Sequence, residues 1–367
     1  MTRLQGRIVT PSGVRAGSIT FGAFIEEVGS KAGGGPYLLP GFVDTHLHGG
    51  NGGDTMDGSQ GVRTLARFHL EHGTTTLYPA TITNPWENIL AALNGVKEVR
   101  EARDPELPDL PGAHLEGPFI SGKRLGAQPD FVLEPTPERV EAVLALGVVS
   151  LVTLAPELPG ALQAARQFAA AGVRVSVGHT VADYETVRAF TKAVRDAGGA
   201  AGFTHLYNAM SPLQSRAPGA VGAALADADS YAELIYDTHH VSEGSFLAAL
   251  AAKPNRLHLV TDSIRACGLE EGTTELGGQT VTVSGGVGRL PDGTLAGSVL
   301  TLDQALRNAL EAGLSLEQAS RLLSQTPARY MGLMDRGTLE VGKRADIVVL
   351  DEDLQVFEVY VAGRKVV

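Results

Sequence analysis

Short apolar segments alternate with longer amphipathic segments through most of the chain. Eight apolar segments have the length and β-branched content of buried strands, and they end near Asp44, Pro79, Glu116, Ala155, Gly178, His205, Asp237 and Thr261. Between them, apolar residues recur with a helical period in residues 62–72, 86–103, 138–146, 162–171, 184–197, 245–252 and 302–312. Eight strand–helix repeats within about 270 residues predict an α/β fold, the (β/α)8 TIM barrel.

The two ends of the chain have a different pattern. Residues 1–39 and 338–367 contain short alternating segments that are broken by glycine-rich turns. Neither end has enough apolar surface to fold alone, so we expect both to pair in one small β-sandwich domain. The barrel domain would then span residues 40–337, and residues 33–36 are predicted to form the crossover into it.

Composition and charge narrow the classes of function. The chain has 367 residues, 43% of them hydrophobic, and no apolar run approaches a membrane span. The N-terminal segment lacks the apolar region of a secretion signal, so we expect a cytoplasmic protein. The single cysteine, Cys267, forms no internal disulfide and has no activating neighbours in sequence. A net charge of −11 argues against nucleic acids and anionic membranes as partners but leaves small anionic substrates open.

Six potential metal ligands or proton carriers lie at the ends of predicted strands: His46, His48, Glu116, His179, His205 and Asp262. Side chains alternate along a strand, so the first two histidines point to the same face. Active sites of (β/α)8 barrels lie at the C-terminal ends of the strands. Histidine and carboxylate ligands without cysteine suit Zn²⁺, Fe²⁺ or Mn²⁺ and a hydrolytic role. We therefore interpret the six residues as a metal site.

Other histidines have simpler interpretations. His69 and His72 fall inside a predicted helix and are expected to be ordinary packing or surface residues. His114 and His258 lie on predicted barrel strands, on the inward face but deeper than the strand ends. We expect these two to pack beneath the metal site or to support its ligands.

Eight short motifs carry a family resemblance: Pro40-Gly-Phe-Val-Asp-Thr-His-Leu-His-Gly, His114-Leu-Glu-Gly-Pro-Phe, Val177-Gly-His-Thr, Thr204-His-Leu-Tyr-Asn-Ala-Met, Arg216-Ala-Pro-Gly, Asp237-Thr-His-His-Val, Val260-Thr-Asp and Leu295-Ala-Gly-Ser. Together they resemble the N-acetylglucosamine-6-phosphate deacetylase family of the amidohydrolase superfamily. The stretch from Gly337 to Val349 is similar to the segment by which many amidohydrolases re-enter their β-sandwich. The His-x-His motif is shared across the superfamily, whereas His-Leu-Glu-Gly-Pro and His-Leu-Tyr-Asn-Ala-Met are specific to this family.

The resemblance implies roles for the candidate residues. Glu116, His179 and His205 would hold the main divalent metal, with zinc as the first choice, and Asp262 would be the catalytic acid and base. Some members of the family lack the His-x-His pair; its presence here implies a second metal site bridged by Glu116. The implied reaction is hydrolysis of the acetamide of N-acetylglucosamine 6-phosphate to glucosamine 6-phosphate and acetate.

The chain has no glycine-rich phosphate loop, so phosphate recognition is inferred from the family resemblance alone. The phosphate would lie against the backbone amides of Asn208 and Ala209, with charge from Arg216 and from His240 rather than His239. The planar fork of arginine matches phosphate oxygens. These charges would come from the same chain or from the neighbouring subunit of a homodimer.

One position departs from the family pattern. Where the family commonly has Gly-Ala-His, this chain has Gly126-Ala127-Gln128. The family histidine is thought to contact the substrate near the acetamide or a ring hydroxyl, and glutamine can replace its hydrogen bond but not its charge. We therefore expect either a shifted loop or a change in turnover and substrate preference.

Three alternatives remain open. A cyclic amidase or nucleobase deaminase would share the barrel and the His-x-His pair, but no lysine that could be carbamylated stands in the place of Glu116. A deacetylase for another N-acetylated sugar is a closer alternative. A non-catalytic binding protein on the same scaffold is the third, and the intact ligand set with Asp262 argues against it.

Overall fold

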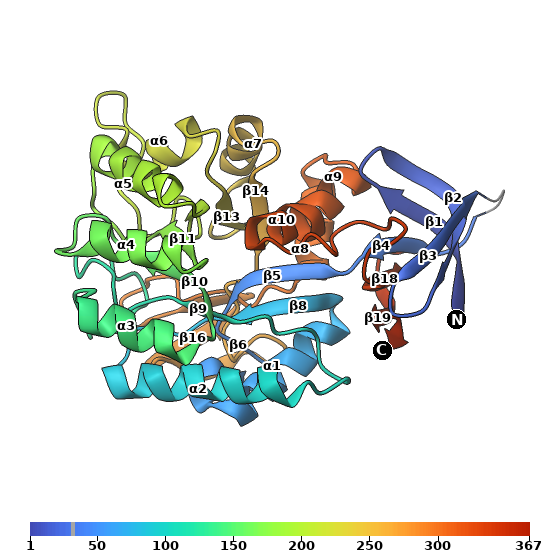
Figure 1. The fold of residues 1–367 in the computed structure, drawn as a ribbon, viewed down its shortest axis with the longest axis horizontal. Helices are drawn as coiled ribbons and strands as arrows, with labels where there is room; N and C mark the ends of the chain where they lie inside the picture. The colour runs from blue at the N-terminus through green and yellow to red at the C-terminus, as the bar shows by residue number, and fades with distance from the viewer. Residues whose placement is uncertain (31–33) are drawn as a thin grey trace.

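A computed structural model describes residues 1–30 and 34–367, and it contains a barrel of parallel strands beside a sheet built from both chain ends (Figure 1). The barrel strands are β5 (Phe42–Leu47), β8 (Thr74–Pro79), β9 (Ala113–Leu115), β10 (Val149–Leu154), β11 (Arg174–Val177), β12 (Ala201–Phe203), β13 (Ala232–Ile235) and β14 (Leu257–Val260). Each ends within about three residues of a strand end expected from the apolar pattern, a normal uncertainty for such boundaries. The predicted barrel is confirmed.

Backbone hydrogen bonds join these strands around the barrel. Strands β9 to β12 form one parallel sheet, and β5–β8 and β13–β14 form two parallel pairs. Thr81 N–H donates to the His114 carbonyl oxygen at 3.0 Å, and Leu206 N–H donates to that of Glu233 at 2.8 Å. The last strand meets the first where Asp262 N–H donates to the His46 carbonyl oxygen at 2.8 Å. Because all strands run in parallel, their C-terminal ends share one rim.

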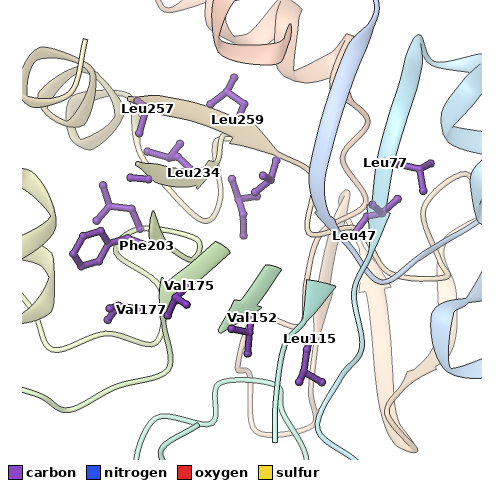
Figure 2. Packing of buried hydrophobic residues seen from close by; sticks show 14 of the residues in the cluster. Leu47, Leu77, Leu115, Val152, Val175, Val177, Phe203, Leu234, Leu257 and Leu259 are labelled. Atoms are coloured by element: carbon purple, nitrogen blue, oxygen red, sulfur yellow. The ribbon is translucent and has the colours of Figure 1, made fainter. Parts of the chain in front are cut away.

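The two faces of the barrel strands differ in chemistry. Figure 2 shows Leu115, Val152, Val177, Phe203 and Leu234 on the successive strands β9 to β13, all within the main hydrophobic cluster that also includes helix residues such as Phe168. The residues that fill the barrel interior are buried and polar: Thr45, His114, Thr153, Ser176, Thr204, Glu233 and His258. Barrel interiors are more often filled by branched apolar side chains. Here a hydrogen-bonded polar layer lies beneath the rim.

Helices cover the outside of the barrel (Figure 1). They are α1 (Ser59–Glu71), α2 (Trp86–Ala102), α3 (Pro137–Leu146), α4 (Ala161–Ala170), α5 (Tyr184–Asp196), α6 (Gly219–Ala226), α7 (Glu243–Ala252) and α8 (Leu302–Glu311). The chain continues through α9 (Leu316–Ser320), a π-helical turn at Arg321–Gln325, and α10 (Thr326–Met331). The sequence pattern did not predict α6, because its residues are all small or apolar and show no polar face.

Both chain ends contribute to one seven-stranded sheet: β1 (Thr2–Thr10), β2 (Gly13–Phe21), β3 (Ile25–Ser30), β4 (Tyr37–Pro40), β18 (Ile347–Leu350), β19 (Val356–Val361) and β20 (Arg364–Lys365). Four strand spacings separate β2 from β19, about 19 Å in a flat sheet. The rings of Phe21 and Tyr360 are nevertheless 5.3 Å apart, so the sheet curls over its own apolar core.

Residues 31–33, which include the start of the predicted crossover, lie outside the described residues. The domain boundaries at residues 39/40 and 337/338 remain a prediction. None of the described helices is both long and apolar enough to cross a bilayer.

A second, smaller sheet was not predicted. Strands β15 (Gly272–Leu276), β16 (Gln279–Ser284) and β17 (Val287–Arg289) form an antiparallel sheet between β14 and α8. Strand β16 does alternate buried valines with polar residues, but β15 and β17 have one buried residue each. Leu276, Thr294 and Leu295 from this region line a pocket at the barrel rim. Two short strands, β6 (Gly49–Gly50) and β7 (Gly53–Asp54), pair next to the end of β5.

Candidate metal centre

The candidate ligands converge at the C-terminal rim of the barrel. Glu116 directly follows β9, and His179, His205 and Asp262 each lie two residues beyond the end of β11, β12 and β14. These last three residues have φ values of 47°, 31° and 48°, in the left-handed region that side-chain-bearing residues seldom adopt. Such strained conformations cluster at functional sites, where the surrounding structure enforces them.

One oxygen of Glu116 faces two histidines. Its Oε1 lies 3.2 Å from His179 Nε2 and 3.0 Å from His205 Nε2. The two Nε2 atoms are themselves 3.0 Å apart. All three side chains are at least nine-tenths buried, so these atoms meet with little access to solvent. The three groups are close enough together to hold one cation.

The other oxygen of Glu116 faces the His-x-His pair. Its Oε2 lies 3.4 Å from His46 Nε2 and 3.2 Å from His48 Nε2. Asp262 Oδ1 lies 3.5 Å and 3.2 Å from the same two nitrogens. His46 falls inside β5 rather than past its end, and the two imidazoles still point to one place, as the alternation of side chains predicted. The structure thus brings together all six residues selected from the sequence.

Charges in this cluster depend on one another. Burial alone would lower the pKa of both imidazoles of the His-x-His pair, but the neighbouring carboxylates outweigh it, raising the pKa of His46 well above its usual value and that of His48 to about 9. The imidazoles in turn outweigh burial at the carboxylates, holding the pKa of Glu116 well below its usual value and that of Asp262 at about 2. The cluster therefore requires positive charge, and a divalent cation can supply it in place of protons.

The ligand histidines are held with Nε2 facing the cluster. His48 Nδ1–H donates to the Ala80 carbonyl oxygen at 3.3 Å, and His179 Nδ1–H donates to that of Arg124 at 2.8 Å. His46 Nδ1 lies 3.1 Å from Glu233 Oε2. Such partners fix the tautomer and orientation of metal-ligating histidines. The donor set and its orientation both fit a divalent metal.

A pocket of about 220 Å³ opens onto the cluster. Of the predicted substrate-binding residues, Gln128, Asn208, Ala209 and His240 line it. Arg216 does not line it, and lies in an exposed stretch of the loop after β12.

Gln128 has both ends of its amide engaged. Its Oε1 accepts a hydrogen bond from Thr83 N–H, and its Nε2 donates to Glu116 Oε2, each at 2.7 Å. The backbone donor at Thr83 can only face an oxygen, so it fixes the orientation of the amide. Gln128 is thus a wall of the pocket that also restrains the central carboxylate.

Two predicted phosphate contacts are already engaged within the chain. His240 Nδ1 lies 2.7 Å from Asp237 Oδ2, and this contact outweighs burial and raises the pKa of His240. The Asp237 carboxylate thus favours the protonated form of this imidazole at the pocket wall. Asn208 N–H donates to the His205 carbonyl oxygen at 2.9 Å, so a phosphate at this amide would have to share or replace that bond. His239 is exposed.

The remaining histidines lie where the sequence placed them. His69 is buried in α1, and His72 caps its C-terminus beside Asp303. His114 donates to or accepts from Thr153 Oγ1 at 2.8 Å, and His258 lies 3.1 Å from Thr45 Oγ1, both below the cluster.

Glu233 was not predicted from the sequence as a site residue. The available signal was a single carboxylate inside the apolar strand Ala232–Ile235, at a position that is only 1% exposed. Acidic residues are seldom buried to this degree unless they are paired.

Comparisons with known proteins agree with this geometry. The sequence matches the model of the amidohydrolase family over residues 37–366. It is 41% identical over 328 residues to N-acetylglucosamine-6-phosphate deacetylase from Bacillus subtilis, covering 87% of this chain and 82% of that protein. It is 37% identical over 333 residues to N-acetylgalactosamine-6-phosphate deacetylase from Escherichia coli O157:H7, covering 89% and 87%.

Solved structures show the same fold over the whole chain. N-acetylglucosamine-6-phosphate deacetylase from Thermotoga maritima has a TM-score of 0.92 and 33% identity, with 100% of this chain and 99% of that chain covered. A variant of the Mycobacterium smegmatis enzyme, in complex with N-acetyl-D-glucosamine-6-phosphate, has a TM-score of 0.92 and 36% identity at the same coverage. The chain therefore belongs to the amidohydrolase family, among relatives named as deacetylases of N-acetylated amino-sugar phosphates.

Proposed function

We propose that this protein hydrolyses the acetamide of N-acetylglucosamine 6-phosphate, giving glucosamine 6-phosphate and acetate. The convergence of Glu116, four imidazoles and Asp262 at the mouth of a substrate-sized pocket carries the proposal. Relatives at 37–41% identity that share the whole barrel bear the name of this activity, which supports it.

Glu116, His179 and His205 would hold the main divalent cation, and His46 and His48 would hold a second one with Glu116 between them. Zn²⁺ is the first choice for this donor set, with Fe²⁺ and Mn²⁺ as alternatives. A divalent cation bound here lowers the pKa of water toward neutrality and polarises the amide carbonyl.

Asp262 would move the protons. Its pKa of about 2 keeps it ionised at neutral pH, so it can accept a proton from the attacking water. The water oxygen forms a bond to the acetyl carbon, and the bond from that carbon to nitrogen breaks. The sugar amine cannot leave as an anion, so Asp262 returns the proton to that nitrogen.

The phosphate would lie against Ala209, Asn208 and His240, whose protonated form Asp237 favours. Arg216 would complete this site from the neighbouring subunit of a homodimer. Arg216 is exposed and is not among the residues that line the pocket of its own chain, which supports a role across a subunit interface. A cytoplasmic location remains a prediction from the sequence.

A comparison of substrates tests the proposal. Charge-assisted hydrogen bonds to phosphate contribute about 1.5–3 kcal/mol each, so two of them favour the phosphorylated sugar by roughly 10²-fold or more. We expect kcat/KM for N-acetylglucosamine 6-phosphate to exceed that for N-acetylglucosamine by at least this factor. Equal values for the two sugars would contradict the phosphosugar assignment while leaving a metal-dependent amide hydrolase.

N-acetylgalactosamine 6-phosphate is the second candidate substrate. The relative from Escherichia coli that bears this substrate's name supports it, as does Gln128 at the pocket wall, where the family commonly has histidine. The same assay with this epimer separates the candidates, because the substrate with the larger kcat/KM is the better fit to the transition state. Turnover of dihydroorotate or adenine instead would favour the cyclic-amidase or deaminase alternative. Absence of bound metal and of any turnover would favour the binding protein.

A further inference from the structure

Glu233 is a buried carboxylate on β13, below the rim of the barrel. It accepts a hydrogen bond at Oε1 from Thr45 Oγ1, at 2.8 Å, and its Oε2 lies 3.1 Å from His46 Nδ1. Thr45 and His46 belong to β5, and β14 lies between β5 and β13 in the barrel, so these contacts cross the interior. A buried carboxylate is stable only when its oxygens receive hydrogen bonds.

The positions of the protons follow from this geometry. The hydroxyl of Thr45 has one proton, and it donates that proton to Glu233. The 3.1 Å contact between Thr45 Oγ1 and His258 Nε2 is therefore a hydrogen bond that His258 donates. A carboxylate has no proton to give, so the bond at Oε2 is donated by His46 Nδ1–H. In the neutral imidazole, this leaves a lone pair on His46 Nε2.

That lone pair faces the metal centre. His46 Nε2 is buried and makes no hydrogen bond within the described part of the chain. Its nearest acidic neighbours are Glu116 Oε2 at 3.4 Å and Asp262 Oδ1 at 3.5 Å. Backbone carbonyl oxygens hold the equivalent Nδ1–H groups of His48 and His179, whereas His46 alone of these three has a carboxylate partner.

We propose that Glu233 is a positioning residue that fixes His46 as an Nε2 ligand and so sets the metal affinity of the His46/His48 half of the centre. A carboxylate partner orients the ring and makes its free nitrogen a stronger donor to a metal than a neutral partner does. The inference rests on the proposed function in one respect, that a divalent cation binds this half. It assigns no contact between Glu233 and the substrate.

Cobalt titration of metal-free protein tests the assignment. Co²⁺ absorption bands and equilibrium dialysis report each Co²⁺ ion bound per chain without an activity assay. The His48→Asn variant identifies which of these ions binds at the His46/His48 half. Glu233→Leu keeps a similar volume but removes the acceptor. We expect Glu233→Leu to lower the affinity for the Co²⁺ ion at the His46/His48 half by about 10- to 100-fold, the usual effect of losing the hydrogen-bond partner of a metal ligand. The affinity for the Co²⁺ ion bound at Glu116, His179 and His205 should stay unchanged.

Glu233→Gln is the conservative rescue. Its amide oxygen can accept from His46 Nδ1–H while its amide nitrogen donates to Thr45, whose hydroxyl then donates to His258 Nε2 in the other tautomer. We expect a Co²⁺ affinity between those of Glu233→Leu and the unchanged protein, because the ring orientation is kept but the partner of His46 is now neutral. Ser176→Ala is the matched control. It removes a buried hydroxyl of the same polar layer, which accepts a 2.8 Å hydrogen bond from Thr204 Oγ1 and forms no hydrogen bond with Glu233 or His46 in the part of the chain that the structure describes. It should cost stability without changing Co²⁺ affinity.

A measurement on the unchanged chain covers the case in which Glu233→Leu does not fold. In Zn²⁺-loaded protein with ¹⁵N-labelled histidine, we expect the His46 signals, assigned by their loss in His46→Asn, to show a protonated Nδ1. The assignment is overturned if His46 Nδ1 carries no proton, if folded Glu233→Leu binds Co²⁺ as the unchanged protein does, or if His48→Asn alters no Co²⁺ affinity. Deacetylation of N-acetylglucosamine 6-phosphate by the unchanged protein is measured separately. If this reaction is not observed, the proposed function fails independently of the role of Glu233.

Discussion

At the scale of single residues, each oxygen of Glu116 faces a different pair of histidines, so one side chain supports both halves of the metal centre. Removing it leaves four imidazoles without the carboxylate between them. We expect Glu116→Ala to lose metal and deacetylase activity together while the barrel stays folded, because the rim holds ligands rather than the apolar core. Elemental analysis, activity and circular dichroism check this, with the exposed Glu311→Ala as control. Stoichiometric metal and full activity in Glu116→Ala would exclude this role.

Asp262 allows ligation and proton transfer to be separated. Its carboxylate contacts the His46/His48 half of the centre, and among the described residues it forms no ion pair with His179 or His205. We expect Asp262→Asn to lower kcat by about 10²–10⁴, the usual range for loss of a positioned acid or base. The metal at Glu116, His179 and His205 should remain. Loss of that metal in elemental analysis would show that Asp262 acts mainly as a ligand.

At the scale of helices and strands, His69 links α1 to two loops of the rim through hydrogen bonds. Its Nε2 lies 3.0 Å from the Gly49 carbonyl oxygen and 3.0 Å from Ser263 Oγ, next to Asp262. Burial lowers the pKa of His69 to about 4. The unfolded chain binds a proton near pH 6.5, so the stability from neutral His69 is complete above about pH 6.5 and is lost as pH falls toward 4.

His69→Gln should remove this pH dependence, because glutamine keeps an N–H donor but does not titrate in this range. We expect the difference in free energy of unfolding between the two proteins to change by up to about 3 kcal/mol between pH 7 and 4. Denaturant titrations of metal-free protein at several pH values measure it. Parallel stability curves for the two proteins across this range would show that His69 is not the titrating group.

The sequence predicted the strands and the rim residues because both depend on local signals. Buried parallel strands are short apolar runs, and the polar residue that ends each run falls at the same rim. Glu233 was not recognised, because its function depends on a contact across the barrel interior with β5, nearly 190 residues earlier in the chain. The sheet β15–β17 was not predicted, although β16 alternates polar and apolar residues between two Gly-Gly turns, because β15 and β17 have only one buried residue each.

At the scale of the whole molecule, the small sheet joins residues from both ends of the chain. Strand β4 of the N-terminal segment pairs with β18 of the C-terminal segment, and Ser324 Oγ donates to the Pro40 carbonyl oxygen at the junction with the barrel. The sheet lies beside the barrel, and none of its described residues lines the pocket at the barrel rim. A subunit interface near the rim would have to form from barrel loops, including the exposed loop that carries Arg216.

If Arg216 acts across such an interface, two impaired variants should complement each other. Arg216→Ala keeps Asp262 but lacks the phosphate contact, and Asp262→Asn keeps Arg216 but lacks the acid and base. In a mixed dimer, the site with intact Asp262 would receive Arg216 from its partner. Random mixing into twofold dimers would then restore about a quarter of all sites. Activity on N-acetylglucosamine 6-phosphate after coexpression measures the gain over the two variants alone. If Arg216 instead served its own chain, every mixed dimer would lack either Arg216 or Asp262 at each site, and mixing would restore nothing.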